Sequence, residues 1–353
     1  MNVLKKIDMS DLHIDFYTPY YCDNNYYKAI IEEKGGKVYA AGLNFAPGSS
    51  RLNIIKPLRQ LLKKEKYDVI HIHSGSISCL AYSALAALSC GVKKIIVHSH
   101  APALKKTLKY RLVKLATSPI MAICPTHYFA CSKEAGEWKF SKRICKKKLE
   151  IVKNGIDINK FMFNAETRSN IRKSLKIKDD CFLIGHVGRF SKEKNHDFLI
   201  DIMSEVIKKN SNSKLLLIGT GDEVENIKSK VNTLGLNDYV IFYGTTPDVN
   251  NYLQAMDCFV FPSLFEGLGI VAVEAQASGL KTICSNAIPL DAKIDDLFEY
   301  MSLSESAEKW ADRILTFSNG YIRADMSEKI KNSGFDIYDT SEFLSNVYLN
   351  RKQ

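Results

Sequence analysis

The chain has 353 residues, of which 46% are apolar and 25% charged, with 19 Gly and 9 Pro. This composition excludes collagenous, low-complexity and disordered chains, and the length accommodates two domains of about 100–200 residues each. The formal charge of +10 is uneven: residues 1–165 carry 27 Lys and Arg against 12 Asp and Glu, whereas residues 166–353 carry 22 against 27. The two halves are therefore expected to bind different partners, and the basic half is expected to bind an anionic surface or ligand.

The start of the chain and its cysteines predict a cytoplasmic protein with free thiols. The sequence contains no run of about 18 apolar residues that could span a membrane. Its first 16 residues, MNVLKKIDMSDLHIDF, lack the unbroken apolar stretch of a signal peptide. The nine cysteines form no C-x2-C pair, and their odd number argues against a disulfide framework.

Short β-branched runs alternate with helical patterns along the first half. Strands are predicted at 12–17, 37–42, 68–74, 94–100 and 127–132, with a last strand and loop within 149–157. The helical patterns between them lie at 52–65, 77–91 and 103–117.

The second half repeats this alternation. Strands are predicted at 181–188, 214–221, 239–244, 258–263 and 281–286, and the clearest helices at 195–209, 222–234 and 267–279. Strands that alternate with helices indicate βαβ units and parallel sheets, so the fold class is α/β with two doubly wound domains. We expect an N-terminal domain over 1–165, a C-terminal domain over 166–330, and a C-terminal helix over 331–353 that packs back toward the N-terminal domain.

Ligands of such sheets bind beyond the carboxyl ends of the strands, where the most informative motifs occur. In GHVGRFSKEKN (185–195), Gly188 allows a close approach of the backbone, and Arg189 and Lys194 follow it. Two cations beside a helix start suit a diphosphate, although a solvated turn gives the same pattern. In IGTGDE (218–223) the dinucleotide fingerprint is incomplete, and acidic residues follow the glycines, so a structural turn is favoured there.

The segment FPSLFEGLGIVAVEAQASG (261–279) is the most informative one. Glu266 and Glu274 are eight positions apart, with Gly267 and Gly269 at the start of an apolar helix. The glycines leave backbone N–H groups open to an anion, and Glu274 is costly to bury without a hydroxyl or cationic partner. We expect both carboxylates to reach one crevice, the alternative being a helix cap and a surface glutamate.

The histidines form two pairs at strand ends. His71 and His73 end one predicted strand, and His98 and His100 end the next, so alternation places each pair on one face of its strand. Without nearby cysteines or strand-end carboxylates, we expect no metal there and interpret a histidine as a hydrogen-bond donor to substrate.

Together these motifs resemble those of the family 4, group 1 glycosyltransferases, which have the GT-B fold of two Rossmann-like domains. The resemblance covers about residues 10–350, and its most specific part is E-x7-E after FPS combined with G-R-x4-K. The matching segments are DVIHIHS (68–74), VHSH (97–100), NGID (154–157), GRFSKEKN (188–195), IGTGDE (218–223), FYGTTPDV (242–249) and FVFPSLFEGLGIVAVEAQASGL (259–280).

The resemblance implies retaining transfer of a sugar, a hexose or N-acetylhexosamine, from a nucleotide-sugar donor, for which UDP-sugars are expected. No metal or other cofactor is implied. Arg189 and Lys194 would clamp the donor diphosphate and stabilise the leaving group, since a departing nucleoside diphosphate needs its charge neutralised. Glu266 would contact the donor sugar near the reacting carbon, and Glu274 would accept hydrogen bonds from the ribose hydroxyls.

Further donor contacts are implied at Gly188, Gly267, Leu268, Gly269 and Ile270. His100 resembles the histidine of the N-terminal domain that approaches the donor sugar. The predicted catalytic residues are therefore Glu266, His100, Arg189 and Lys194. Because no carboxylate is placed as a nucleophile, retention is expected to proceed by front-face attack within an ion pair.

The HSH motif and the length resemble the bacterial capsule and exopolysaccharide branch. That branch implies a glycan or lipid-diphosphate-linked acceptor at the inner membrane face. Basic residues concentrate in ALKKTLKYRLVKL (103–115), where they surround Leu104, Leu108, Leu112 and Leu115, and in KFSKRICKKK (139–148). Such an amphipathic helix can lie on an anionic leaflet, so we expect a peripheral membrane contact; an ordinary solvated helix is the alternative.

The chain departs from the family pattern at its start. Family members open with an apolar strand and a glycine-rich loop some 20–25 residues before the point where this chain begins. The first strand of the N-terminal domain is therefore expected to be missing, with Met1 an internal or misassigned start, and this loss would leave two parallel strands without a neighbour.

Other functions fit the sequence less well. A catalytically impaired fragment or a non-catalytic partner subunit would share these fold motifs. A nucleotide-sugar epimerase shares the two-domain fold, but its own motifs are not visible, and hydride transfer lacks the full dinucleotide fingerprint. Nucleic acid is not expected as a partner because no recognition module is present.

Overall fold

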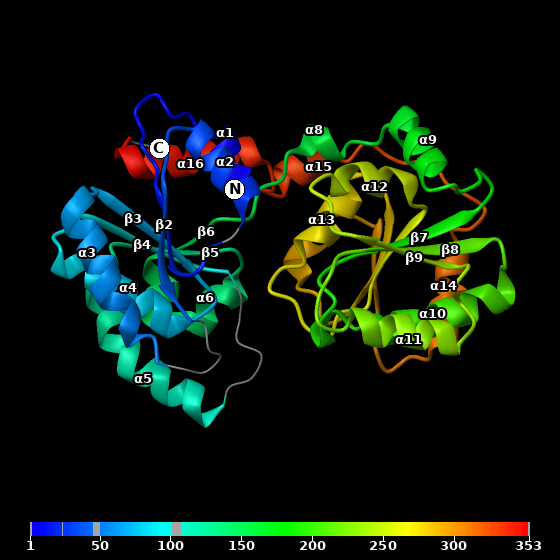
Figure 1. Cartoon of the computed structure of the whole chain (residues 1–353), viewed down its shortest axis with the longest axis horizontal. Coiled ribbons are helices and arrows are strands. Elements are labelled where there is room, and N and C mark those ends of the chain that lie inside the picture. The colour runs from blue at the N-terminus through cyan, green and yellow to red at the C-terminus, as the bar shows by residue number, and fades with distance from the viewer. Residues whose placement is uncertain (1, 23, 45–49, 101–106, 352–353) are drawn as a thin grey trace. The chain divides into compact units, whose positions relative to one another are not determined.

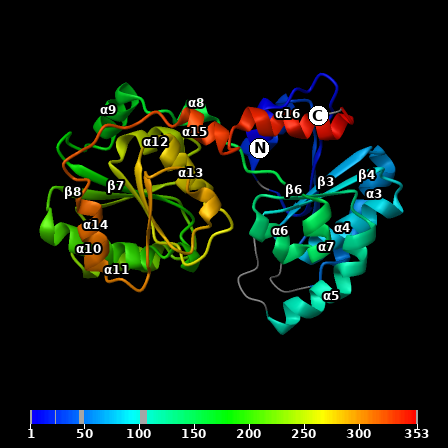
Figure 2. The same ribbon diagram turned by 180° about the vertical axis from the view of Figure 1, so that it is seen from behind.

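The computed structural model describes residues 2–22, 24–44, 50–100 and 107–351, and the chain divides into two compact units. Unit 1 comprises residues 1–155 and 337–353, and unit 2 comprises residues 156–336. Both are α/β units of parallel strands and interleaved helices (Figures 1 and 2). No helix within the described ranges is long and apolar enough to cross a membrane.

The two units meet in the chain at residues 155/156 and 336/337, whereas the sequence predicts boundaries at 165/166 and 330/331. Helix α8 (Ile158–Phe161) packs on helices of unit 2, and Ile158 is buried in the core of that unit. At the other boundary, Phe335 is fully buried in the same core, and residues 156 and 336 form an isolated parallel bridge. Both segments lie in unit 2 because of these tertiary contacts.

Among its described residues, unit 1 has six parallel strands in two sheets. The strands are β1 (Phe16–Tyr20), β2 (Val38–Leu43), β3 (Val69–Ser74), β4 (Lys94–Ser99), β5 (His127–Ala130) and β6 (Leu149–Ile151). β1 pairs with β2, whereas the other four form one sheet in the order β3-β4-β5-β6. The helices of unit 1 are α1 (Asn2–Lys6), α2 (Asn25–Glu33), η1 (Leu52–Ile54), α3 (Ile55–Glu65), α4 (Ile77–Ser89), α5 (Leu108–Ile123), α6 (Lys133–Lys139), α7 (Lys142–Lys147) and α16 (Ile337–Leu349).

The two faces of β4 are covered by different helices. Ile95 and Val97 pack into the cluster that contains Leu80 of α4, whereas Ile96, on the opposite face, packs with Leu344 of α16. This alternation follows from the two-residue period of a strand. It places the even-numbered residues of β4 on the face that α16 covers.

The C-terminal helix α16 is anchored to β4 by a lysine. Lys94 is buried, and its Nζ donates to the backbone carbonyls of Val347 and Tyr348 in the last turn of α16. A cation there satisfies carbonyls that have no partner within the helix and is favoured by the helix dipole. Helix α16 also lies beside α1, so both ends of the chain belong to unit 1 (Figure 1).

Unit 2 contains one six-stranded parallel sheet. Its strands are β7 (Phe182–Val187), β8 (Ser213–Ile218), β9 (Val240–Gly244), β10 (Cys258–Phe261), β11 (Lys281–Ser285) and β12 (Phe298–Met301). The remaining elements of unit 2 are α9 (Ala165–Ser174), η2 (Lys192–Lys194), α10 (His196–Lys209), α11 (Val224–Thr233), α12 (Val249–Ala255), α13 (Ile270–Ala277), η3 (Leu290–Ala292), α14 (Ala307–Leu315) and α15 (Ser327–Asn332).

The strand order of this sheet locates a ligand site. The order is β12-β11-β10-β7-β8-β9, so the direction of winding reverses between β7 and β10. Ligands of doubly wound sheets bind at this switch point, outside the carboxyl ends of the strands. The segments that follow β7 and β10 are the two motifs that the sequence analysis selects.

Candidate functional site

The loop after β7 holds two predicted cations in different environments. Phe190 is fully buried and fixes the loop, while Arg189 next to it is exposed. Lys194 ends the short helix η2 and is partly buried. The loop therefore presents one exposed guanidinium and one largely buried ammonium.

Gly188 brings Lys194 close to the end of β7. A Cβ at Gly188 would lie 3.3 Å from Cδ of Lys194 and 3.1 Å from Nε2 of His186. Both distances are tighter than ordinary van der Waals contact. A larger residue here would therefore displace the lysine stem.

The turn after β8 packs directly on this loop. A Cβ at Gly219 would lie 1.9 Å from the carbonyl oxygen of Gly188, and one at Gly221 would lie 2.3 Å from that of Phe190. Both glycines also have positive φ angles, 147° and 158°. Only glycine fits at these two positions, because both the space and the backbone conformation exclude a side chain.

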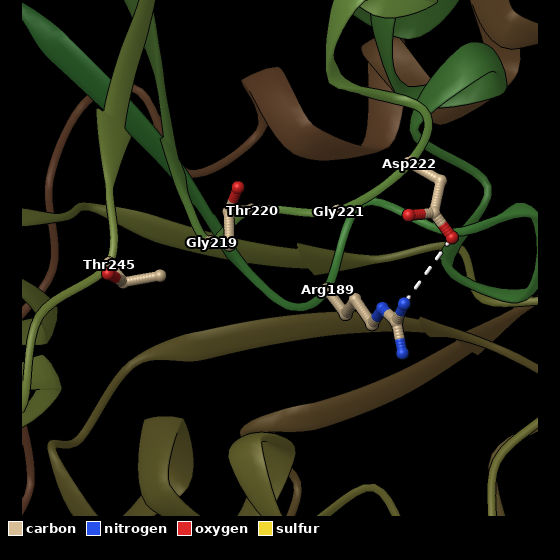
Figure 3. Close-up of a pocket in the computed structure, with 6 residues that line it drawn as sticks. All are labelled: Arg189, Gly219, Thr220, Gly221, Asp222 and Thr245. Atoms are coloured by element: carbon tan, nitrogen blue, oxygen red, sulfur yellow. Dashed lines mark hydrogen bonds and ion pairs between the residues drawn. The ribbon is translucent and has the colours of Figure 1, made fainter. Parts of the chain in front are cut away.

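A pocket of about 640 Å³ opens where these two loops meet. Its lining residues are Arg189, Gly219, Thr220, Gly221, Asp222 and Thr245 (Figure 3). Nη2 of Arg189 lies 3.3 Å from Oδ2 of Asp222, and both side chains are mostly exposed. An exposed ion pair of this kind contributes little stability, so a phosphate can replace Asp222 as the partner of Arg189.

The loop after β10 joins the loop after β7 at the switch point. Nζ of Lys194 lies 2.5 Å from Oε1 of Glu266, and both side chains are largely buried. The backbone N–H of Leu264 donates to the carbonyl of Glu193 at 2.7 Å. Two predicted catalytic residues 72 positions apart are thus brought into direct contact.

Helix α13 begins immediately after this loop. Gly269 caps it with a φ of +76°, and Cγ of Glu266 lies 3.8 Å from the point where its Cβ would be. Leu268 is buried, Gly267 and Ile270 are partly exposed, and the N–H of Ala272 in the first turn donates to the carbonyl of Gly269 at 2.8 Å. The predicted helix over 267–279 is therefore shorter in the structure, because the left-handed conformation of Gly269 ends the loop just before Ile270.

Glu274 lies one turn into α13, on a helix whose other residues are apolar or amide. Burial raises the pKa of Glu274 to about 7. A carboxylate in this environment gains from hydroxyl donors of a ligand, because burial has removed the water that would otherwise solvate it.

His100 belongs to unit 1, where it directly follows β4. Its Nε2 is 2.7 Å from Nδ1 of His73, and burial lowers the pKa of His100 to about 4. The predicted contact between His100 and the donor sugar stays a prediction.

The pocket residues Thr220, Asp222 and Thr245 are absent from the predicted site. The sequence predicts a structural turn after β8, and the packing of its two glycines agrees with that prediction. The same turn also lines the pocket. The signal that could have indicated this role is its position, since it follows a parallel strand adjacent to β7.

Comparisons with known proteins match both units. The family model Glycosyltransferase Family 4 matches residues 10–160, and Glycosyl transferases group 1 matches residues 167–334. The putative glycosyltransferase EpsF of Bacillus subtilis is 30% identical, over 99% of this chain and 91% of that protein. The UDP-Gal:alpha-D-GlcNAc-diphosphoundecaprenol alpha-1,3-galactosyltransferase of Escherichia coli is 27% identical, over 83% of this chain and 78% of that protein.

Solved structures agree in fold. Anabaena HepE, in complex with UDP and glucose, superposes with a TM-score of 0.76 at 17% identity, covering 98% of this chain and 94% of that one. A glycosyltransferase from Rickettsia africae superposes with a TM-score of 0.73 at 15% identity, covering 99% and 93%.

Proposed function

Because the chain belongs to the group 1 glycosyltransferases of family 4 and has their GT-B fold, we propose that it moves a sugar from a UDP-sugar to a glycan or lipid-diphosphate-linked acceptor. The transfer retains the anomeric configuration and serves the synthesis of a cell-surface polysaccharide. The observation that carries this proposal is the meeting of Lys194 and Glu266 at the switch point of unit 2, beside the pocket that Arg189 lines.

Arg189, Lys194 and the start of α13 would receive the donor diphosphate. Arg189 exchanges its exposed partner Asp222 for a phosphate, while Lys194 is already fixed next to Glu266. The N–H groups from Gly267 to Ile270 add donors at a helix start, where negative charge is favoured. With two cations to neutralise the leaving diphosphate, we propose that no divalent metal is needed at this step.

The two glutamates would contact different parts of the donor. Glu266 contacts the sugar near its reacting carbon, since it lies between Lys194 and the start of α13. Glu274 accepts hydrogen bonds from the ribose hydroxyls, because burial has removed much of the water that would otherwise solvate its carboxylate. The transferred sugar is a hexose or an N-acetylhexosamine, and the name of the Escherichia coli relative supports a UDP-linked hexose.

A panel of nucleotide sugars tests this function together with the role of Arg189. We expect the wild-type chain to bind UDP and to hydrolyse one UDP-sugar slowly without an acceptor. Arg189→Ala is expected to weaken UDP binding by about tenfold or more, because a hydrogen bond to a charged group contributes about 1.5–3 kcal/mol. Calorimetric titration with UDP measures the change.

Asp222→Ala is the matched control, because it removes the partner of Arg189 and leaves the cation in place. This variant is expected to bind UDP at least as tightly as the wild type. Unchanged UDP affinity in Arg189→Ala contradicts the diphosphate assignment. A wild-type chain that binds no nucleotide sugar supports a non-catalytic partner subunit instead.

Helix α5 of unit 1 supports the peripheral membrane contact that the sequence predicts. Leu108, Leu112 and Leu115 recur at helical spacing on one side of α5 and are 73%, 58% and 72% exposed. Arg111 of the same helix is an exposed basic residue, and unit 1 carries further exposed basic residues on α7. Leu104, Lys105 and Lys106 of the predicted amphipathic helix lie outside the described residues. We propose that this face of unit 1 binds an anionic lipid surface, where the acceptor lipid is embedded.

Vesicle co-sedimentation tests the lipid contact. We expect phosphatidylglycerol vesicles to retain the protein at low salt and to release it at high salt. The triple change Leu108→Ser, Leu112→Ser, Leu115→Ser is expected to reduce retention by about tenfold or more, since a fully buried leucine contributes about 1.5–3 kcal/mol.

Leu290→Ser combined with Ile322→Ser is the control, because both residues are exposed apolar side chains of unit 2. This pair is expected to leave retention unchanged. Equal retention by phosphatidylcholine and phosphatidylglycerol vesicles would count against an electrostatic contribution to the contact.

A further inference from the structure

Four histidines form one row on the sheet of unit 1. His71 and His73 belong to β3, His98 belongs to β4, and His100 directly follows it. In the parallel pairing of β3 with β4, His73 lies opposite His98, so all four rings project from the same face. The ring centroids of His71 and His73 are 4.0 Å apart, and those of His98 and His100 are 4.2 Å apart.

Three of these rings have the spacing of metal ligands. One nitrogen each from His71, His73 and His98 lie within 4.8 Å of one another. Nε2 of His71 is 3.2 Å from Nδ1 of His98. Two nitrogens bound tetrahedrally to zinc at 2.0–2.1 Å are about 3.3–3.4 Å apart, so this pair needs almost no rearrangement to share an ion.

The other ring nitrogens of two of these histidines are already engaged. Nδ1 of His71 lies 2.6 Å from the hydroxyl of Tyr348 in α16, and Nδ1 of His73 lies 2.7 Å from Nε2 of His100. Metal-binding histidines usually donate their second N–H to such a partner, which fixes the ring and the tautomer. If Nδ1 carries the proton in both rings, Nε2 of each is left with a lone pair for a cation.

His98 supplies a further observation. It is only 3% exposed, and its Nδ1 is the nitrogen that faces Nε2 of His71. Burial and the neighbouring imidazoles hold the pKa of His71 and of His98 well below the ordinary value.

We propose that His71, His73 and His98 bind one zinc ion, with solvent in the fourth position. An all-imidazole ligand set selects zinc and similar transition metals over magnesium and calcium, which prefer oxygen ligands. His73 is exposed and gives the ion a route from solvent. The three histidines all belong to unit 1, and none of them lines the pocket of unit 2, so this proposal does not rest on the proposed function.

The ion would link the carboxyl ends of β3 and β4 and hold the ring of His73. Because His73 contacts His100, the metal would also fix the orientation of the histidine that the sequence analysis assigns to the donor sugar. The proposed ligands thus act on His100 as positioning residues.

Zinc titration against a chromophoric chelator tests the site. The nine free cysteines can also bind zinc, so accessible thiols are first blocked with N-ethylmaleimide. We expect the folded, blocked chain to take up one zinc ion, and an excess of magnesium not to displace it. His73→Gln is expected to weaken zinc binding by about tenfold or more. It removes an exposed ligand, so the variant is expected to stay folded, which circular dichroism checks.

His127→Gln is the matched control, because His127 lies on β5 of the same sheet but outside the cluster. It is expected to bind zinc with wild-type affinity. Absence of stoichiometric binding in the wild type overturns the proposal, and so does equal affinity in His73→Gln. Either result would mean that the four rings form only a hydrogen-bonded row.

Discussion

Lys194→Met is expected to reduce turnover of the sugar donor by about 10²–10³-fold, the usual effect of removing one group that stabilises charge in a transition state. Methionine keeps the length and apolar stem of the lysine but loses the cation. The leaving diphosphate then lacks its most firmly held positive partner, and Glu266 loses the ammonium beside it. Release of UDP from the donor selected by the nucleotide-sugar panel measures the loss.

The neighbouring Lys192 provides the control for this change. It belongs to the same short helix η2 but is exposed, so Lys192→Met is expected to leave turnover unchanged. Lys194→Met also leaves a largely buried carboxylate unpaired, which lowers stability. The double change with Glu266→Gln removes that penalty and should recover thermal stability without recovering turnover. Turnover of Lys194→Met within about threefold of the wild type would contradict this account of the transition state.

Glu274→Gln is expected to stabilise the ligand-free protein at pH 8 while weakening UDP binding. The pKa of Glu274 is raised from 4.5 to about 7, so the folded state holds a proton that the unfolded state releases above pH 4.5. Stability of the wild type therefore falls as pH rises from about 4.5 to 7, and the full penalty is present above that range. One pKa unit corresponds to about 1.4 kcal/mol, and since Glu274 keeps some solvent contact we expect a gain of about 2 kcal/mol for the amide.

Thermal melts at pH 5 and pH 8 measure this prediction. The melting temperature of Glu274→Gln should exceed that of the wild type at pH 8, and the difference should shrink at pH 5. UDP affinity at pH 8 should fall by about tenfold or more, because a neutral amide accepts weaker hydrogen bonds from the ribose hydroxyls. The exposed Glu328, changed to Gln, should alter neither quantity. The key quantity is the difference in melting temperature between Glu274→Gln and the wild type. If this difference is no larger at pH 8 than at pH 5, Glu274 is solvated rather than buried.

The sequence predicts the strand ends of unit 2 well because its signals are local there. A largely buried strand followed by Gly188 and Arg189 identifies the end of β7, and the rule for doubly wound sheets then predicts where a ligand binds. The role of the turn after β8 is harder to predict from the sequence. Its acidic Asp222 suggests repulsion of a phosphate, but the structure pairs it with Arg189, which lies 33 residues earlier.

The features that the sequence does not predict depend on contacts between segments that are distant in the chain. Alternation predicts that His98 and His100 share a face, but the register that sets His73 opposite His98 depends on how two strands pair, and one sequence does not contain that information. The domain boundaries likewise depend on the packing of Ile158 and Phe335 into a distant core. Local patterns of hydrophobicity are similar on both sides of each boundary.

The lysine that caps α16 has a consequence for biosynthesis. On the ribosome, residues up to 155 emerge first, but α16, which covers Ile96 on β4, follows only after all of unit 2 has been made. Unit 2 is continuous and has the contacts of its own core as soon as it leaves the exit tunnel. Until α16 has been synthesised, the face of β4 that carries Ile96 lacks this helix, and the ammonium of Lys94 lacks the carbonyls of Val347 and Tyr348. Unit 1 can therefore be completed only after the whole of unit 2 has been synthesised.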